Sequence, residues 1–466
     1  MKHSMKYCVT IVVLMLLWCN VAQAQDYVRD RIQPWSENPR FWQYKGDPVL
    51  LIGGSDEDNL FNNPQLMRKN LKRLQEIGGN YIRLTLSCRD EGDEWPFRKE
   101  GELYNLDKLN PKFFNRLENC LKMAWEMDII VQIELWATFD FYMDYWPANA
   151  WNPLNNKSLT TENTRLKTAW ADHPARNVQP FFYAPPMLHN DKLVLKYQRK
   201  FINRVMSIAL KYPNVLYCGD NETNTTYAWT TFWMHYIKRL ADKAGKKIET
   251  TQMFDGHYED IEYIMSKPEM FTFVECNKLF APQKWSTQGE AQWHKTLEIM
   301  DSMGEQSRPM TIVKLRGTSN NMPGDETIES VKKYWRGLLA GYSALRFHRP
   351  VSLGLSKPAQ ASILAIRKLE NNVKFWDLQP RLNLLKNREE DEAYLRADPG
   401  FAYVMYYTDG GAVGLDLSKY SGSNFALRWV DIATGQWAGS ENIAGGSVVG
   451  IAAPDAGGWA AVITKR

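Results

Sequence analysis

The chain has 466 residues, a formal net charge of +4 and 44% hydrophobic residues. This near balance of charge argues against a nucleic-acid-binding or membrane-surface role. The length suffices for one large domain and one small one.

The first 24 residues have the three parts of a secretory signal peptide. Lys2 and Lys6 provide a positive start, residues 8–19 form an apolar run, and residues 22–24 (Ala-Gln-Ala) form a cleavage site. The alternative is an uncleaved membrane anchor, but the apolar run is shorter than the ~20 residues that a spanning helix needs. We therefore expect export to the periplasm or the extracellular space. The mature chain would begin at Gln25 and carry no integral membrane segment.

Short apolar runs alternate with amphipathic helical patterns after the signal peptide. The predicted strands are residues 49–52, 81–84, 129–133, 215–217, 248–253, 271–274, 310–313 and 344–347. The predicted helices are residues 63–77, 111–125, 192–211, 230–244, 292–302, 328–340 and a last one around 363–375. Eight strand–helix units with short apolar strands are typical of a parallel (β/α)8 TIM barrel. The alternative, an open doubly wound sheet, is weakened because no G-x-G-x-x-G motif follows the first strand.

The connection between residues 136 and 183 is too long for a plain loop. Its aromatic load argues against disorder and includes Trp136, Phe139, Phe141, Tyr142, Tyr145, Trp146, Trp151 and Trp170. Long ordered loops in compact domains are usually functional. We expect this one to cover the barrel mouth, with Trp136 in the wall of a sugar subsite, since flat aromatic faces suit sugar rings. Aromatic-rich cores are also common.

From residue 377 onward, short alternating runs are separated by Gly-rich turns, as in "FAYVMYYTDGGAVGLDLS" and "GWAAVITKR". This pattern predicts an antiparallel β-sandwich. The predicted organisation is a signal peptide at residues 1–24, a barrel at residues 25–376 and a β-sandwich at residues 377–466.

The cysteines that remain after cleavage fit neither a metal motif nor a dense disulfide framework. They are Cys88, Cys120, Cys218 and Cys276. We expect them to be small core residues, and we predict no metal or organic cofactor.

Polar residues at the carboxyl ends of the predicted strands are the candidates for an active site, because such barrels build their sites there. Those expected to bind substrate are Asp56, Arg83, Glu134, Trp136, Asn221, His257, Lys314 and His348. Arg83 has a second interpretation, as an interior residue that positions the acid/base carboxylate. The two histidines are balanced between substrate contact and satisfied core residues.

The fourth strand ends in "CGDNETNT", where Asp220, Asn221 and Glu222 are adjacent. Cleavage of a glycosidic bond needs two carboxylates across a cleft: one protonates the leaving oxygen, and the other stabilises or attacks the developing oxocarbenium ion. We expect Glu222 to be the acid/base and Asn221 to contact a sugar hydroxyl. Alternatively, Asp220 and Asn221 cap the following helix, and Glu222 is an ordinary loop carboxylate.

Three stretches carry a resemblance to known families. "GDNETN" is similar to the Asn-Glu signature of clan A glycoside hydrolases, in which the Glu is the acid/base. "NPRFWQYKGDPVLLIGGS" resembles the start of apiosidase-like barrels, a family that includes enzymes acting on plant pectin side chains. "EAYLRADPGFAYVMYYTDGGAVGLDLS" is similar to a small β domain with a collagen-binding label that commonly follows such a barrel. The resemblance covers most of the mature chain and implies a glycoside hydrolase.

The seventh strand departs from the clan A pattern, which places a nucleophilic Glu at its end. "RPMTIVKLRG" offers Lys314 there, and a positive charge would oppose a cationic transition state. Lys314 could instead bind an anionic substrate, such as a uronic acid, or lower the pKa of a nearby carboxylate. Glu275, at the end of the sixth strand, is therefore the expected nucleophile or base. Its alternative is a structural salt bridge to Lys314 or Arg316.

The sequence thus predicts an exported glycoside hydrolase that cleaves O-glycosidic bonds in a plant or microbial polysaccharide or oligosaccharide. The expected partner is a carbohydrate and not a nucleic acid. The alternative is a non-catalytic glycan-binding protein on a degenerate glycosidase barrel.

Overall fold

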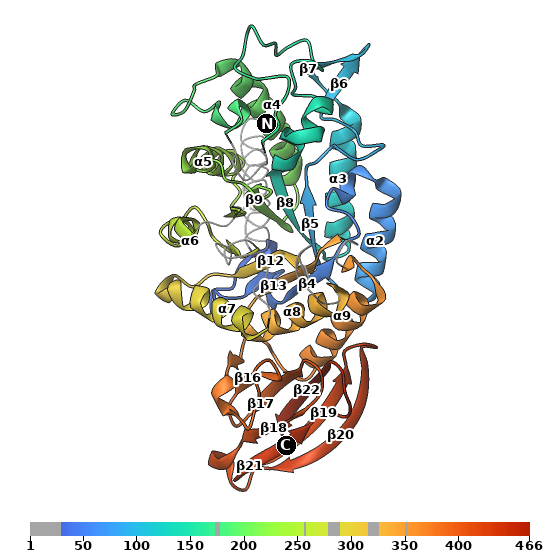
Figure 1. Ribbon diagram of the computed structural model, residues 1–466, viewed down its shortest axis with the longest axis vertical. Coiled ribbons are helices and arrows are strands. Elements are labelled where there is room, and N and C mark those ends of the chain that lie inside the picture. The colour runs from blue at the N-terminus through green and yellow to red at the C-terminus, as the bar shows by residue number, and fades with distance from the viewer. Residues whose placement is uncertain (1–28, 173–177, 256–257, 278–288, 316–325, 350–352) are drawn as a thin grey trace, which may run out of the picture.

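The computed structural model describes residues 29–172, 178–255, 258–277, 289–315, 326–349 and 353–466 (Figure 1). The predicted signal peptide lies outside the described residues. Eight parallel strands form one sheet in the order β10-β9-β8-β5-β4-β13-β12-β11. Their bounds are β4 (Leu51–Gly54), β5 (Tyr81–Thr85), β8 (Ile130–Trp136), β9 (Val215–Asp220), β10 (Glu249–Thr251), β11 (Val274–Glu275), β12 (Met310–Leu315) and β13 (Ala344–Phe347).

The two end strands of this sheet approach each other, so the sheet is nearly closed. The backbone N–H of Thr272, just before β11, donates to the carbonyl of Thr250 in β10 at 2.9 Å. The predicted (β/α)8 barrel is therefore confirmed, and each predicted strand overlaps or adjoins one of the eight.

Close approach of β4 and β5 requires a glycine. Gly53 lies opposite Tyr81 in the strand register, and a Cβ at position 53 would lie 1.8 Å from the Tyr81 carbonyl oxygen. Real atoms cannot approach so closely, so any side chain would push the two strands apart. Every residue of β4 and β5 is buried, as expected for parallel strands that are covered on both faces.

Helices surround the barrel (Figure 1). Their bounds are α2 (Pro64–Glu76), α3 (Pro111–Glu126), α4 (Lys192–Ala209), α5 (Tyr227–Lys243), α6 (Tyr258–Met265), α7 (Glu290–Ser302), α8 (Glu326–Ala340) and α9 (Lys357–Glu370). Asn63 and Asn110 cap α2 and α3 with their side chains, and a proline follows each cap, which is a favourable helix start. The sequence patterns did not predict α6, and α9 begins earlier than predicted.

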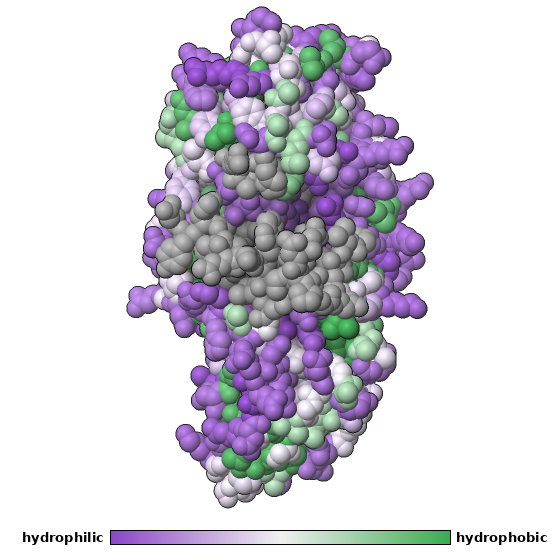
Figure 2. Space-filling view, viewed as in Figure 1, coloured by the Kyte–Doolittle hydropathy of each residue, from purple (hydrophilic) through white to green (hydrophobic). Residues whose placement is uncertain are grey.

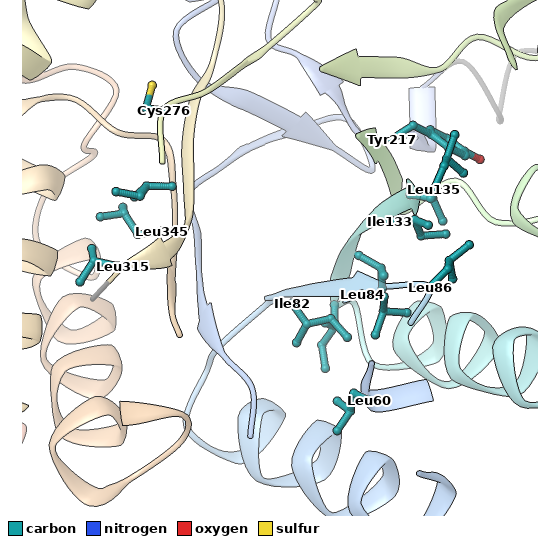
Figure 3. Close-up of a cluster of buried hydrophobic side chains, with 14 of the residues drawn as sticks. Leu60, Ile82, Leu84, Leu86, Ile133, Leu135, Tyr217, Cys276, Leu315 and Leu345 are labelled. Carbon is teal, nitrogen blue, oxygen red and sulfur yellow. The ribbon is translucent and has the colours of Figure 1, made fainter. Parts of the chain in front are cut away.

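The main apolar core lies between the strands and the helices. Figure 3 shows Ile82 and Leu84 of β5 and Ile133 and Leu135 of β8 in this cluster. A second, smaller core fills the barrel interior at its amino-terminal end. There Trp42 packs against Phe273 with ring centroids 5.3 Å apart. Trp42 belongs to a three-stranded sheet of β1 (Gln33–Pro34), β2 (Trp42–Tyr44) and β3 (Asp47–Val49). Because apolar side chains fill the amino-terminal end of the barrel interior, the polar interior side chains lie toward the carboxyl-terminal end.

Two further parts of the barrel region were not predicted in detail. A hairpin of β6 (Phe97–Glu100) and β7 (Leu103–Leu109) follows β5. The long aromatic connection contains the short 3-10 helices η2 (Thr138–Phe141), η3 (Met143–Ala148) and η5 (Pro180–Tyr183).

The carboxyl-terminal region contains two antiparallel sheets, ordered β14-β16-β17-β22-β19-β20 and β15-β18-β21. Their bounds are β14 (Gln379–Pro380), β15 (Leu385–Lys386), β16 (Ala393–Asp398), β17 (Ala402–Tyr407), β18 (Ala412–Asp416), β19 (Asn424–Asp431), β20 (Gln436–Ala444), β21 (Val448–Ala452) and β22 (Trp459–Lys465). A separate apolar cluster, which includes Leu395, Met405 and Leu415, lies between the sheets. The predicted sandwich architecture is therefore observed.

One face of the larger sheet packs on the barrel helices (Figure 1). Tyr406 of β17 stacks on Trp335 of α8 with centroids 5.7 Å apart. Arg336 of α8 donates from its Nε to Asp391 at 2.8 Å. The two parts of the chain thus share apolar and ionic contacts.

Candidate active site

Glu222 follows β9 directly, at the carboxyl-terminal end of the barrel. The backbone N–H of Asn221 donates to the Trp136 carbonyl at 2.9 Å, and that of Thr223 donates to the Met253 carbonyl at 3.0 Å. Between these two fixed residues, Glu222 has a φ of 53°. This left-handed conformation is uncommon for a residue with a side chain and costs energy, so the neighbouring strands impose the direction in which the Glu222 side chain leaves the backbone.

Lys314, near the end of β12, pairs with this carboxylate. Its ammonium nitrogen lies 2.9 Å from Glu222 Oε1 and donates a hydrogen bond to the Asn221 side-chain oxygen. Burial lowers the pKa of Lys314 to about 8, although the negative charge of Glu222 acts in the opposite direction. The position at which the clan A pattern has a nucleophilic Glu therefore holds a cation that contacts both Asn221 and Glu222.

A second ion pair lies deeper in the barrel. Arg83 Nε lies 2.6 Å from Glu134 Oε1, and its Nη1 donates to Asp58 at 2.9 Å. The Thr85 hydroxyl donates to the other oxygen of Glu134 at 2.7 Å. Arg83 is thus the interior residue that one interpretation expected, but its contacts are to Glu134 and Asp58.

Asp58 is the centre of a cationic cluster. Arg346 lies 3.2 Å from Asp58 Oδ1, His348 Nδ1 lies 3.7 Å from the same oxygen, and Arg349 Nε lies 3.6 Å from Oδ2. Burial alone would raise the pKa of Asp58, but the positive charges of Arg83, Arg346 and Lys314 hold it well below its ordinary value. Burial lowers the pKa of His348 well below its ordinary value despite Asp58, so the imidazole is neutral near pH 7.

Neither Asp58 nor Arg346 was among the residues that the sequence was expected to place at the substrate. The alternation of side chains along β13 was the available indication: Ala344 faces the barrel interior, so Arg346, two residues on, faces it as well.

Glu275 lies inside the barrel and is 1% exposed. Its carboxylate accepts hydrogen bonds from the Thr311 hydroxyl at 2.8 Å and from the Asn277 backbone N–H at 3.0 Å. Burial, reinforced by the negative charge of Glu134, raises the pKa of Glu275 to about 7. Of the two alternative salt-bridge partners of Glu275, Lys314 pairs instead with Glu222, and Arg316 lies outside the described residues. The role of Glu275 as nucleophile or base stays a prediction.

Asp220 has a structural role, but it is not the helix cap that the sequence suggested. It accepts hydrogen bonds from the Trp229 indole at 3.1 Å and from the Gln252 amide, and burial raises its pKa to about 7. The cap of α5 is Thr226, whose side chain accepts from the Trp229 N–H. Asp220 therefore ties β9 to α5.

Two predicted substrate contacts are directed at the protein itself. Asp56 pairs with Arg73 of α2 and accepts from the Leu355 N–H at 2.8 Å, so this carboxylate connects elements around β4. Trp136 is 1% exposed and packs against Trp233 with centroids 5.1 Å apart. This packing favours the aromatic-core alternative, and the role of Trp136 as a subsite wall stays a prediction. His257 lies outside the described residues.

A small, mostly apolar cleft next to this aromatic core contains a carboxylate that sequence analysis missed. It is lined by Leu86, Cys88, Trp95, Pro96, Leu135, Trp136, Ala137, Asp140, Phe141, Asn149, Trp151 and Phe201. Asp140 accepts from the Ser87 hydroxyl and from the Cys88 N–H, both at 2.9 Å, and burial raises its pKa to about 6. These contacts satisfy Asp140 within the fold.

The four described cysteines are buried and form no disulfide, as predicted. Within the described ranges, no three or more His, Cys, Asp or Glu side chains are grouped so as to hold a metal ion. No helix in the same ranges is long and apolar enough to span a bilayer.

Figure 2 shows a hydrophilic hollow near the middle of the part of the molecule that contains the barrel.

Comparison with solved structures identifies the same architecture in other proteins. A glycoside hydrolase family 5 protein from Bacteroides vulgatus ATCC 8482 matches 94% of this chain and 94% of its own, with a TM-score of 0.64 and 11% identity. A protein described as a glycoside hydrolase matches 94% of this chain and 98% of its own, with a TM-score of 0.63 and 12% identity. A second Bacteroides vulgatus ATCC 8482 protein, described as a glycoside hydrolase by inference, matches 94% of this chain and 83% of its own, with a TM-score of 0.60 and 13% identity.

No protein-family model matches the sequence, and no curated protein matches it either. At 11 to 13% identity, the structural likeness establishes a TIM barrel followed by an antiparallel β domain. What the chain does must therefore be inferred from its own site.

Proposed function

We propose that this chain is a glycoside hydrolase that cleaves O-glycosidic bonds in a plant or microbial polysaccharide or oligosaccharide. The observation that carries the proposal is the placement of Glu222. This residue is held in a left-handed conformation after β9, beside Asn221, and its Oε1 lies 2.9 Å from the Lys314 ammonium nitrogen. Strain of this kind persists only where the surrounding structure imposes it, and it is concentrated at functional sites. The barrel architecture that the chain shares with glycoside hydrolases supports the same class of reaction.

In this mechanism Glu222 is the acid/base. It donates a proton to the glycosidic oxygen as the bond to the anomeric carbon breaks, and general acid catalysis of this kind contributes roughly 10²- to 10⁴-fold in rate. Asn221 would hold a sugar hydroxyl beside the reacting carbon. Its side-chain oxygen already accepts from Lys314, so its amide group is oriented with the N–H donors away from that contact.

Glu275 is the second carboxylate of the proposal, as nucleophile or as the base that activates water. Its pKa of about 7 makes it ionised in a growing fraction of molecules as the pH rises through neutrality. A separation of ~5 Å from Glu222 in the substrate complex would give retention, and ~6.5 to 9.5 Å would give inversion.

The alternative function is non-catalytic glycan binding on the same barrel. Two observations favour it: Lys314 holds Glu222 in an ion pair, and Glu275 is 1% exposed. A binding protein would recognise oligosaccharides without changing them.

The experiment compares the purified wild type with Glu222→Gln on a panel of neutral and acidic plant oligosaccharides, with products separated by chromatography. Glu298→Gln, on the exposed surface of α7, is the matched control. The proposal expects cleavage of at least one panel member by wild type and by the control, with a rate lower by roughly 10²-fold or more in Glu222→Gln. Equal rates in Glu222→Gln and wild type would refute the assignment, and binding without cleavage would favour the alternative.

The finer parts of the proposal rest on the sequence. The resemblance to apiosidase-like barrels makes pectin-derived oligosaccharides the first members of the panel. The β domain is proposed as a brace for α8 and α9 rather than as a collagen-binding module, because its larger sheet packs on the barrel. Export is proposed from the signal peptide. Mass spectrometry of the secreted protein should find Gln25 at its amino terminus, and retention of residues 1–24 would contradict this.

A further inference from the structure

We propose that Lys314 binds a carboxylate of the substrate, as in a uronic acid, and that this binding frees Glu222 to take up the proton it transfers. The inference rests on the function proposed above and adds the class of substrate. It explains why the barrel holds a buried lysine where a nucleophilic carboxylate would otherwise lie.

Lys314 has hydrogen-bonding capacity to spare. An ammonium group has three N–H donors, and within the described part of the chain it reaches two acceptors, Glu222 Oε1 and the Asn221 side-chain oxygen. Lys314 is 8% exposed, so its charge is poorly solvated. A substrate carboxylate would accept a charge-assisted hydrogen bond from a donor that water cannot easily satisfy.

The charges of the described buried groups around Lys314 balance one another. Three buried cations, Lys314, Arg83 and Arg346, form ion pairs with three carboxylates, Glu222, Glu134 and Asp58. His348 is neutral near pH 7, and Glu275 is mostly protonated below pH 7. At the rim, Arg349 interacts with both Asp58 and Glu57. With Lys314 and Glu222 both charged, the buried set is neutral.

The proposed reaction disturbs that balance, because a proton donor must carry its proton before the bond breaks. When Glu222 takes up a proton from water, the buried set gains one positive charge that is centred on Lys314. An isolated buried charge is costly. A substrate carboxylate that accepts a hydrogen bond from Lys314 restores neutrality, so its binding and the protonation of Glu222 favour each other. The proton then passes to the leaving oxygen, and Glu222 returns to its ion pair.

The test uses three sets of short oligosaccharides that differ in one group: galacturonic or glucuronic acid oligosaccharides, their methyl esters, and the corresponding carboxyl-reduced neutral sugars. Binding to the full-length protein at pH 6 is measured by calorimetry for wild type, Glu222→Gln, Lys314→Met and Lys314→Arg. Lys386→Met, a half-exposed lysine of the β domain, is the control for loss of a positive charge. Circular dichroism verifies that each variant is folded.

Glu222→Gln has the shape of the protonated carboxyl group and leaves the Lys314 charge uncompensated. We expect it to bind the acidic sugars about tenfold or more tighter than wild type, because a hydrogen bond to a charged group contributes about that much, and to bind the esters no tighter. Lys314→Met should lose the preference for acid over ester, and Lys314→Arg should retain part of it. Should Lys314→Met fail to fold, the comparison of wild type with Glu222→Gln decides by itself.

The inference and the proposed function fail in different ways. If wild type binds and cleaves the esters and the neutral sugars as well as the acids, the inference is overturned and the hydrolase remains. If the acids bind selectively through Lys314 and none is cleaved, carboxylate recognition stands and the hydrolase is refuted. Equal affinity of Glu222→Gln and wild type for the acids would also overturn the inference.

Discussion

Replacement of Glu275 by Gln should change the pH dependence of stability by a predictable amount. Burial raises the pKa of Glu275 from 4.5 to about 7, so between these values the folded protein holds a proton that the unfolded chain releases. This contribution to stability is fully present below pH 4.5 and is lost as the pH rises through 7. At 1.36 kcal/mol per pKa unit, the whole change amounts to about 3 kcal/mol.

The amide introduced by Glu275→Gln has no proton to lose. The free energy of unfolding of the variant should therefore increase relative to that of wild type as the pH rises. From pH 5 to pH 8 the difference in unfolding free energy should move by about 2.5 kcal/mol in favour of the variant, which corresponds to roughly 3 °C in Tm for a protein of this size. Thermal unfolding of both proteins at pH 5, 6, 7 and 8 measures it, with Glu298→Gln as the surface control. A difference that stays constant with pH, or that moves in favour of wild type, would refute the assignment of a buried, protonated Glu275.

Three other predictions follow from particular contacts. Trp136→Ala should lose about 3 to 5 kcal/mol of unfolding free energy in urea, as expected for a buried aromatic core residue, while oligosaccharide affinity stays within twofold; a selective loss of affinity would instead support Trp136 as the wall of a sugar subsite. Gly53→Ala should yield little soluble folded protein in an expression and gel-filtration assay, because its Cβ would lie 1.8 Å from the Tyr81 carbonyl oxygen, and a normal Tm would contradict this. Selective binding of acidic over esterified sugars should weaken as the pH rises, because it is coupled to proton uptake by Glu222, and should be lost above pH 8, where Lys314 loses its proton; selectivity that persists at pH 9.5 would contradict a role for its charge.

Much of the fold could be predicted from the sequence because buried parallel strands appear in it as short apolar runs. Runs such as residues 129–133 and 310–313 are apolar on both faces, and eight of them alternate with helical patterns. The hydrophobic pattern of the short helix α6 is weaker, since this helix has only eight residues. The aromatic connection was recognised as ordered, but its composition does not say whether an indole faces a core or a ligand.

The sequence predicted individual residues of the site but not the pairs that they form. The position of Glu222 followed from the end of the fourth strand, but its pairing with Lys314 joins residues far apart in the chain and depends on how β9 and β12 face each other across the barrel. The same limit applies to Asp58, whose partners Arg83, Arg346 and His348 come from two strands and the residue beyond one of them. Charge neutrality of such a set is a property of the assembled barrel and cannot be seen along the sequence.

Proton donation by Glu222 is tested most directly by varying the leaving group. The sugar that wild type cleaves is prepared as an oligosaccharide, whose leaving alkoxide needs a proton, and as a dinitrophenyl glycoside, whose leaving phenolate does not. The account predicts that Glu222→Gln loses roughly 10²- to 10⁴-fold in kcat/KM on the oligosaccharide and far less on the dinitrophenyl glycoside. Equal losses on both substrates, or no loss on the oligosaccharide, would contradict the assignment of Glu222 as the acid.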